Sequence, residues 1–87
     1  MLFVTILTWN PENRNEIVQR RAEKGAMIPE GITVVGEWGD LSGCRDVIVF
    51  ETDDADALLM DSMNWNDLIK MGTFPAMEAE KVMSEVS

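Results

Sequence analysis

The chain has 87 residues, with 16 acidic against 7 basic side chains, no histidine and one cysteine, so its net charge is −9. The length predicts a single domain over residues 1–87, and a composition that is 46 % hydrophobic is that of a folded protein. These counts exclude a disulfide framework, histidine-ligated zinc or haem, and most nucleophilic triads. The charge also argues against nucleic acid or an anionic membrane surface as the main partner.

The N-terminus predicts a mature strand and no targeting segment. Met1 to Trp9 is apolar but has no basic leader, and Asn10-Pro11 follows it in place of a small-residue cleavage site. No apolar run approaches the roughly 18 residues that span a bilayer. A lone Cys44 suits a reducing compartment, so we expect a cytoplasmic protein without membrane contact.

The first element is a strand over Leu2 to Trp9, rich in β-branched and aromatic residues. Its alternating side chains are apolar on both faces, which predicts a central strand covered on both sides. Asn10 as N-cap and Pro11 in the first turn predict a helix from Pro11 to about Lys24. Gly25 then offers a stop for that helix.

Two further strands are predicted over Ile32–Trp38 and Arg45–Glu51, joined by a turn that carries two glycines. A second helix begins with Thr52 or Asp53 as its cap, and two asparagines end it before residue 69. A last strand lies within Thr73–Met83, and its proline limits the first part of that strand to a sheet edge or a bulge.

The resulting β-α-β-β-α-β order predicts an α+β, ferredoxin-like fold: an antiparallel four-stranded sheet with two helices on one face. The other face is bare in a single copy. Because the central strands are apolar on both sides, that face would form a hydrophobic patch larger than soluble monomers usually expose. We therefore predict a homodimer through the open sheet face, which makes a dimeric α/β barrel.

Five short segments resemble a small bacterial and viral family, domain of unknown function 3303, within the dimeric α/β-barrel superfamily. The resemblance runs from Met1 to about Glu80 and implies a ferredoxin-like dimer without an established activity. The wider superfamily includes cofactor-free monooxygenases, haem-degrading enzymes and small-molecule or stress-related modules, so the fold is a loose guide to function. In order, the segments are Pro11-Glu12-Asn13-Arg14, Pro29-Glu30-Gly31, Gly36-Glu37-Trp38, Phe50-Glu51-Thr52-Asp53-Asp54 and Trp65-Asn66-Asp67-Leu68.

Tryptophan and asparagine side chains form the candidate ligand pocket between sheet and helices. In quinone- or anthrone-oxidising relatives, an Asn amide and a Trp indole N–H hold the substrate oxygen as its anion forms. This sequence lacks the Tyr or His that would relay a proton, so only carboxylates such as Glu37 or Glu51 are available. Packing in a thin core is the simpler explanation of the tryptophans. The candidate residues are Trp9, Asn10, Trp38, Met63, Trp65 and Asn66.

Other polar patterns have simpler structural explanations. The acidic run Glu51 to Asp56 lacks the spacing of a calcium loop and is expected to cap a helix. Glu16 and Arg20 lie four residues apart and are expected to pair on the exposed face of the first helix. Cys44 has no Cys or His neighbour, so we interpret it as a structural thiol.

Three functions remain open. The first is a homodimeric module that binds a small apolar or aromatic ligand between sheet and helices. The second is a cofactor-free monooxygenase or isomerase acting on an enolisable small molecule. The third is a protein-interaction module that uses the acidic second helix, where six acids and no base lie between residues 51 and 67. We assign no catalytic residue, no metal and no cofactor.

Overall fold

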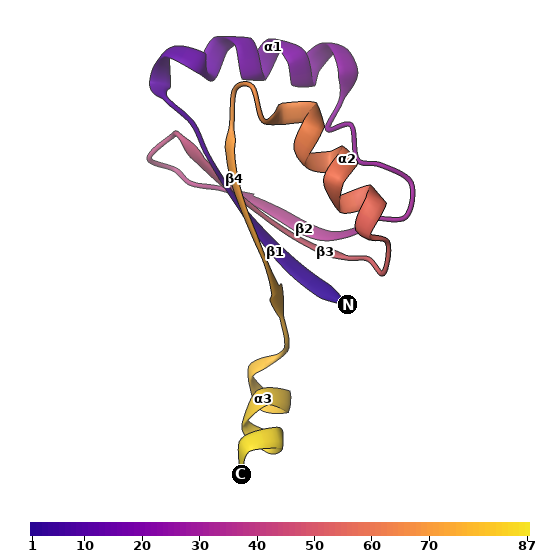
Figure 1. Ribbon diagram of the computed structural model, residues 1–87. Helices are drawn as coiled ribbons and strands as arrows, with labels where there is room; N and C mark the ends of the chain where they lie inside the picture. The colour runs from indigo at the N-terminus through magenta and orange to yellow at the C-terminus, as the bar shows by residue number, and fades with distance from the viewer.

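The computed structural model describes the whole chain, Met1–Ser87, as an antiparallel sheet with two helices on one face and a third helix beyond it (Figure 1). The strands are β1 (Leu2–Thr8), β2 (Thr33–Gly39), β3 (Arg45–Glu51) and β4 (Lys70–Ala76). The helices are a 3-10 turn η1 (Pro11–Asn13), α1 (Arg14–Lys24), α2 (Ala55–Trp65) and α3 (Ala79–Val86). No helix is long and apolar enough to cross a membrane.

The sheet has the strand order β2-β3-β1-β4, with every neighbouring pair antiparallel. The predicted ferredoxin-like arrangement is therefore confirmed, with β1 and β3 in the centre. Pro75 lies in β4, which is an edge strand, as the missing backbone donor requires. A bulge between Val34 and Gly36 shifts the register of β2 on β3 by one residue.

The two faces of the sheet differ in what covers them. Leu7 of β1 packs with Ile17, Trp65 and Ile69 in the buried core under α1 and α2. Leu2, Val4 and Ile6 of β1 alternate with Leu7 and therefore point to the opposite face of the sheet, which no helix covers. Their cross-strand partners in β3 and β4 point to the same open face. The apolar side chains on this open face are Leu2, Val4, Ile6, Trp38, Val47, Val49, Phe74 and Ala76.

The predicted first helix begins differently from expected. The Asn10 side chain makes no capping hydrogen bond, and its backbone oxygen accepts instead from the N–H of Asn13 at 2.9 Å. The helical segment therefore starts with the 3-10 turn η1, and α1 itself begins at Arg14. Gly25 ends α1 with a φ of 72°, a left-handed value that glycine adopts without strain.

The cap of α2 is Asp54, one residue after the predicted positions. Its carboxylate accepts from the backbone N–H groups of Asp56 and Ala57, at 3.0 and 3.3 Å. Thr52 is buried and donates its hydroxyl proton to the Gly31 carbonyl at 2.7 Å, while Asp53 binds the terminal amine of Met1. The acidic run thus has three separate local structural roles.

The C-terminal segment is the largest departure from the sequence analysis. The last strand is Lys70–Ala76, and the end of the predicted Thr73–Met83 strand is helix α3. Its apolar residues recur at helical spacing, at positions 79, 82, 83 and 86, which a search for a last strand overlooks. In Figure 1, α3 stands apart from the sheet and the other helices at the lower end of the molecule.

Candidate functional site

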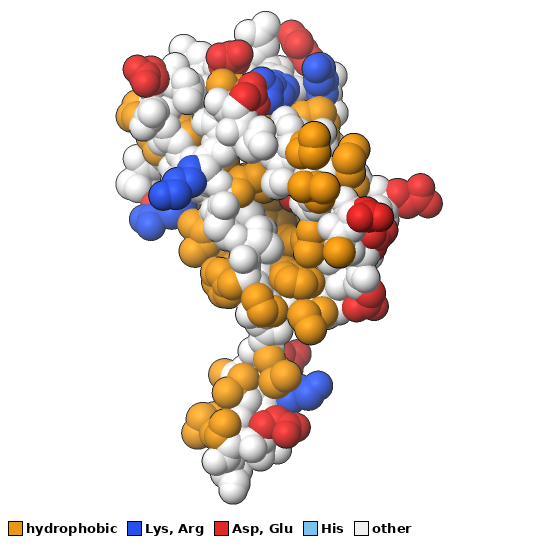
Figure 2. Space-filling view, viewed as in Figure 1, with side chains coloured by type: hydrophobic (Ala, Val, Ile, Leu, Met, Phe, Trp, Pro, Cys, Tyr) orange, Lys and Arg blue, Asp and Glu red, His pale blue; other side chains and the backbone are white.

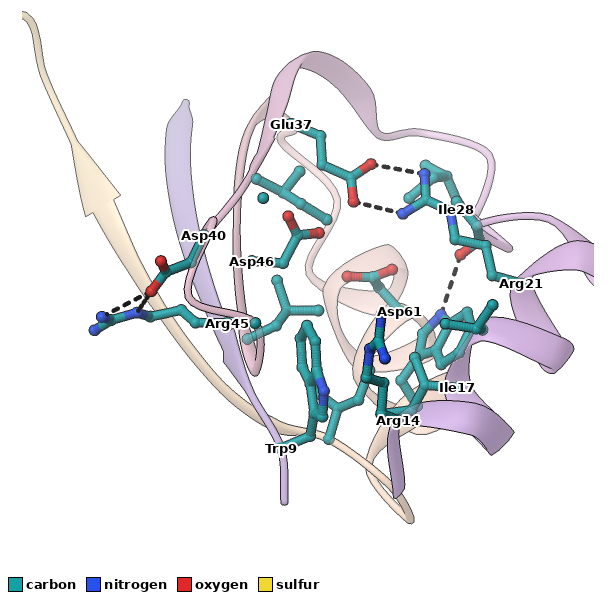
Figure 3. Close-up of a pocket in the computed structure, with 18 residues that line it drawn as sticks. Trp9, Arg14, Ile17, Arg21, Ile28, Glu37, Asp40, Arg45, Asp46 and Asp61 are labelled. Carbon is teal, nitrogen blue, oxygen red and sulfur yellow. Dashed lines mark hydrogen bonds and ion pairs between the residues drawn. The ribbon is translucent and has the colours of Figure 1, made fainter. Parts of the chain in front are cut away.

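A cavity of about 540 Å³ lies between the sheet and helices α1 and α2. Its apolar wall combines strand and helix side chains, and Figure 3 shows how they surround the opening. Charged side chains reach the cavity from β2, β3 and their hairpin and also from α1 and α2. The apolar wall includes Leu7, Trp9, Ile17, Ile48, Trp65 and Ile69, and the charged residues are Arg14, Arg21, Glu37, Asp40, Arg45, Asp46 and Asp61.

Trp65 is a fixed part of the wall. Only 6 % of the residue is exposed, and its indole N–H donates to the Ala26 carbonyl at 3.1 Å. The Arg20 guanidinium lies over the ring, 5.5 Å from its centroid, and binds both carboxylate oxygens of Asp67 at 2.7 and 2.8 Å. Arg20 therefore joins α1 to the end of α2, and the prediction that it pairs with Glu16 is wrong.

Trp9 has a different environment. It follows β1, and Figure 3 shows its ring standing in the cavity wall beside the α1 residues. Its Nε1 is buried and has no hydrogen-bond partner, the one such side-chain atom in the chain. A buried donor without an acceptor costs about 1–3 kcal/mol. One residue of the cavity wall thus has an indole donor without an acceptor.

Three carboxyl groups, those of Glu37, Asp46 and Asp61, line the cavity (Figure 3). Glu37 of β2 forms a bidentate ion pair with Arg21 of α1, one contact being 2.8 Å, and this pair lowers the pKa of Glu37 to about 2. Burial raises the pKa of Asp46 to about 7, and the nearby Glu37 carboxylate adds to the effect. Burial alone raises the pKa of Asp61. The cavity therefore holds a carboxyl group that exchanges its proton near neutral pH.

Asp46 and Asp61 are absent from the sequence-based candidates, although each has a periodic signal. Asp46 is two and four residues before Ile48 and Phe50, so it shares their face of β3, toward the helices. Asp61 is four residues before Trp65, so it lies on the inward side of α2. The sequence signal for both residues is a carboxyl group at a position whose periodicity otherwise predicts the apolar, inward face of a strand or helix.

The structure brings together only part of the predicted ligand set. Trp9 and Trp65 both line the main cavity. Asn10 and Asn66 meet Trp9 at a neighbouring, more open hollow of about 590 Å³. Met63 is 59 % exposed and lines neither space.

Trp38 is on the opposite side of the sheet from the cavity, so the prediction that it joins Trp9 and Trp65 does not hold. Its partner in β3 is Val47, an open-face residue, and 57 % of the tryptophan is exposed. A Cβ placed on Gly36 would lie 2.5 Å from Trp38 Cη2, so the indole lies directly over that glycine. Of the two suggested carboxylates, Glu37 lines the cavity, whereas Glu51 shares the open-face register of Leu2.

The strand order and the two helices on one face define the ferredoxin-like class of α+β fold. Within this class, the chain belongs to the family described as domain of unknown function (DUF3303), which matches residues 1–87. No curated protein matches the chain.

Two solved structures share this fold at low sequence identity. One is a Deinococcus radiodurans protein named among the antibiotic biosynthesis monooxygenases, with 17 % identity and a TM-score of 0.50 over 91 % of this chain and 95 % of that one. The other is an uncharacterised NIPSNAP domain protein from Burkholderia xenovorans, with 13 % identity and a TM-score of 0.50 over 91 % and 97 % of the two chains. At these identities the similarity shows the fold and no activity.

Proposed function

We propose that this protein binds a small molecule with an apolar or aromatic body and one hydrogen-bond acceptor in the cavity between sheet and helices. The observation that carries the proposal is Trp9, a residue of the cavity wall whose buried indole Nε1 has no hydrogen-bond partner. Because Nε1 is closed to solvent in the empty cavity, a ligand carbonyl or phenolate oxygen would satisfy this donor once the ring turns it toward the cavity. The Trp65 N–H is already bound to Ala26, so Trp9 is the anchoring indole.

The size and lining of the cavity suit such a ligand. A volume of about 540 Å³ is within the range of small-molecule sites, and half of the 18 lining residues are hydrophobic. Isoleucine, leucine and tryptophan side chains supply the apolar contacts. Glu37 is held in its ion pair with Arg21, whereas burial raises the pKa of the Asp46 carboxyl to about 7.

The binding test uses the indole N–H signals of the three tryptophans in a nitrogen–proton correlation spectrum. The probe is 2-acetylnaphthalene, and naphthalene, which has no acceptor, is its matched control. We expect 2-acetylnaphthalene to move the Trp9 signal, assigned with Trp9→Phe, while the Trp38 signal stays in place. Equal movement of all three signals, or none with either compound, would refute the proposal.

A second candidate, proton transfer on an enolisable carbonyl compound, is favoured by the position and raised pKa of Asp46. The Asp46 carboxylate would take a proton from the carbon beside the carbonyl, and the enolate oxygen would accept the Trp9 N–H. Return of the proton to another carbon makes the reaction an isomerisation. Reaction of the enolate with O2 instead makes it a cofactor-free oxygenation.

The proton-transfer test is hydrogen–deuterium exchange at the methyl group of 2-acetylnaphthalene in D2O. Exchange catalysed by the protein should rise with pH around an apparent pKa of about 7 and vanish in Asp46→Asn. Asp53→Asn is the matched control, because Asp53 binds the Met1 amine and does not line the cavity. Unchanged exchange in Asp46→Asn would exclude this chemistry and leave the binding proposal standing.

We also propose a homodimer through the open sheet face. Its support is the apolar centre of that face, which includes Val4, Val47 and Val49 from the two central strands and Trp38 beside them. Two such faces packed together would form the shared interior of a barrel. Sedimentation equilibrium should give twice the chain mass at micromolar concentration, and a single-chain mass there would refute the dimer.

A further inference from the structure

Asp61 is a partly buried carboxyl group without a partner in its own chain. It lies on the inward side of α2, four residues before Trp65, and it lines the cavity between sheet and helices (Figure 3). Burial raises the pKa of its carboxyl group, and neither a hydrogen bond nor a neighbouring charge contributes to that shift. In its ionised form, Asp61 therefore lacks the counter-charge that buried carboxylates usually have.

The two carboxyl oxygens of Asp61 are unpaired but open to solvent. No ion pair reaches the residue. The one buried side-chain atom that is both unpaired and closed to solvent is the Nε1 of Trp9, so the Asp61 oxygens are accessible. Because Asp61 also lines the cavity, a molecule inside it can reach these oxygens without a rearrangement of the wall.

Two ion pairs neutralise four of the other charged side chains that line the cavity. Arg21 of α1 binds Glu37 of β2, with one contact of 2.8 Å, and Arg45 of β3 binds Asp40 at 3.0 Å. Each pair joins one acid to one base through a charge-assisted hydrogen bond. Neither pair therefore offers a ligand an uncompensated charge.

Three charged groups of the lining lie outside these pairs. Arg14, the first residue of α1, is exposed, so solvent screens its effect on a charged ligand. Asp46 of β3 has charged neighbours of both signs, because Glu37 raises and Arg21 lowers the pKa of its carboxyl group. Asp61 is the lining carboxyl group whose pKa no neighbouring charge shifts. Its charge is therefore the one that a ligand would have to balance.

The charge of the whole chain favours a cation at this position. The net charge is −9, and Figure 2 shows acidic side chains over the upper and right-hand parts of the visible face. Such a field attracts cations and repels anions as they approach a site. Inside the cavity, a partly buried carboxylate attracts a cation more strongly than an exposed one does, because solvent screens it less.

We propose that the ligand of this cavity carries a protonated amino group, which Asp61 binds. The inference rests on the proposed binding function and deepens it, because it names the ligand class: an apolar or aromatic amine that also has an acceptor oxygen for Trp9. The apolar wall, which includes Leu7, Ile17 and Ile48, would contact the body of such a ligand. Its ammonium group would donate to the Asp61 oxygens in a charge-assisted hydrogen bond that a neutral hydroxyl group cannot equal.

The test compares two probes with the same body by isothermal titration calorimetry at about pH 7.5. The compound 6-(aminomethyl)-2-acetylnaphthalene carries a cation, and 6-(hydroxymethyl)-2-acetylnaphthalene carries a neutral group of similar size. We expect the amine to bind the wild type at least about tenfold more tightly than the alcohol. Asp61→Asn should reduce this ratio to less than about threefold, while the affinity for the alcohol changes by less than about threefold.

Two matched variants remove the same charge elsewhere. Asp56→Asn changes an exposed residue of α2 outside the cavity, so the ratio should stay within about twofold of the wild-type value. Asp46→Asn should keep a ratio of at least about fivefold. A ratio that is lost in Asp46→Asn and kept in Asp61→Asn overturns the assignment to Asp61. A ratio that falls equally in Asp56→Asn and Asp61→Asn overturns the ammonium site, because it then reflects only the overall charge.

The wild type alone separates the failure of this inference from the failure of the binding proposal. Equal affinities for the amine and the alcohol overturn the ammonium site and leave the binding proposal standing. The same holds if the amine does not bind while 2-acetylnaphthalene moves the Trp9 signal. If neither naphthalene ketone nor its derivatives bind, both proposals are wrong.

Discussion

The two faces of the one sheet are built from the same kinds of side chain but have opposite surroundings. Leu7 and Ile6 are neighbours in β1, yet Leu7 is 6 % exposed under the helices and Ile6 is 38 % exposed on the open face. The covered face holds the core and the cavity, while the open face is apolar without a cover. An apolar strand pattern therefore marks two surfaces to be covered, and only one of them is covered by the chain itself.

A tryptophan lies on each side of the sheet, Trp65 of α2 on the covered side and Trp38 of β2 on the open side, so the two sides can be compared by mutating one tryptophan at a time. Trp65 is 6 % exposed and fully hydrogen-bonded on the covered side, whereas Trp38 is 57 % exposed above Gly36 on the open side. If the open face is an interface, the two side chains should control different quantities: folding for Trp65 and association for Trp38.

The largest effect should come from Trp65→Ala. Loss of a buried aromatic side chain costs about 3–5 kcal/mol, a large part of the stability of a domain of this size. The variant also removes the surface under Arg20 and the bond to Ala26. Urea unfolding followed by circular dichroism should show the loss, and a change below about 1 kcal/mol would contradict the core assignment.

Trp38→Ala should leave the fold intact and weaken the dimer. A central interface tryptophan contributes about 2 kcal/mol or more to binding, which corresponds to roughly a thirtyfold higher dissociation constant. Dilution experiments by sedimentation velocity measure this constant, and circular dichroism verifies the fold. If the dissociation constant does not change, the open face is not the dimer surface.

Asp46→Asn tests the covered face through pH. The pKa of Asp46 is raised in the folded chain to about 7 from an ordinary 3.8, so the unfolded state loses its proton first as pH rises. The free energy of unfolding should therefore fall between about pH 4 and pH 7, by an amount on the order of 1 kcal/mol for this partly solvated group.

Asp46→Asn should remove this decrease and be the more stable form above pH 7, as urea unfolding at pH 5 and pH 8 can show. Glu37 has the opposite effect on the pH dependence of the free energy of unfolding, because its pKa is lowered from 4.5 to about 2. Its ion pair contributes its full stability only above pH 4.5. Its contribution is lost as pH falls from about 4.5 toward 2, outside the window of Asp46. If the free energy of unfolding changed equally with pH in Asp46→Asn and in the wild type, the titrating group would not be Asp46.

The smallest effect should come from Gly36→Ala. The added Cβ would lie 2.5 Å from the Trp38 ring, so the indole must turn outward. Because this ring is 57 % exposed in the single chain, the free energy of unfolding of the monomer, measured at high dilution, should change by less than about 1 kcal/mol, whereas the fluorescence of Trp38 should shift. Gly72→Ala is the control, since nothing lies near a Cβ at that position. A fluorescence spectrum identical to that of the wild type would show that the indole does not lie over Gly36.

Periodicity and strand order were sufficient to predict the sheet, because apolar alternation in β1 and β3 directly reflects their central place. The cavity was harder, since its polar groups come from β2, β3, α1 and α2, and their convergence depends on packing. Trp38 shows the limit: the bulge after Val34 decides which face each later residue of β2 occupies. The helix α3 was missed because its short apolar stripe was included in the search for a last strand.

The place of β1 in the sheet also has a consequence for how the nascent chain folds. Its partner on one side is β4, and the hydrogen bond between the Thr5 and Thr73 side chains joins residues 68 positions apart. The ribosome must therefore release the residues up to Ala76 before the sheet can close, and until then β1 exposes apolar side chains on both faces. During that interval its free edge is a site for misassociation between chains, so slower synthesis should not help this protein, whereas a chaperone that shields its first ten residues should.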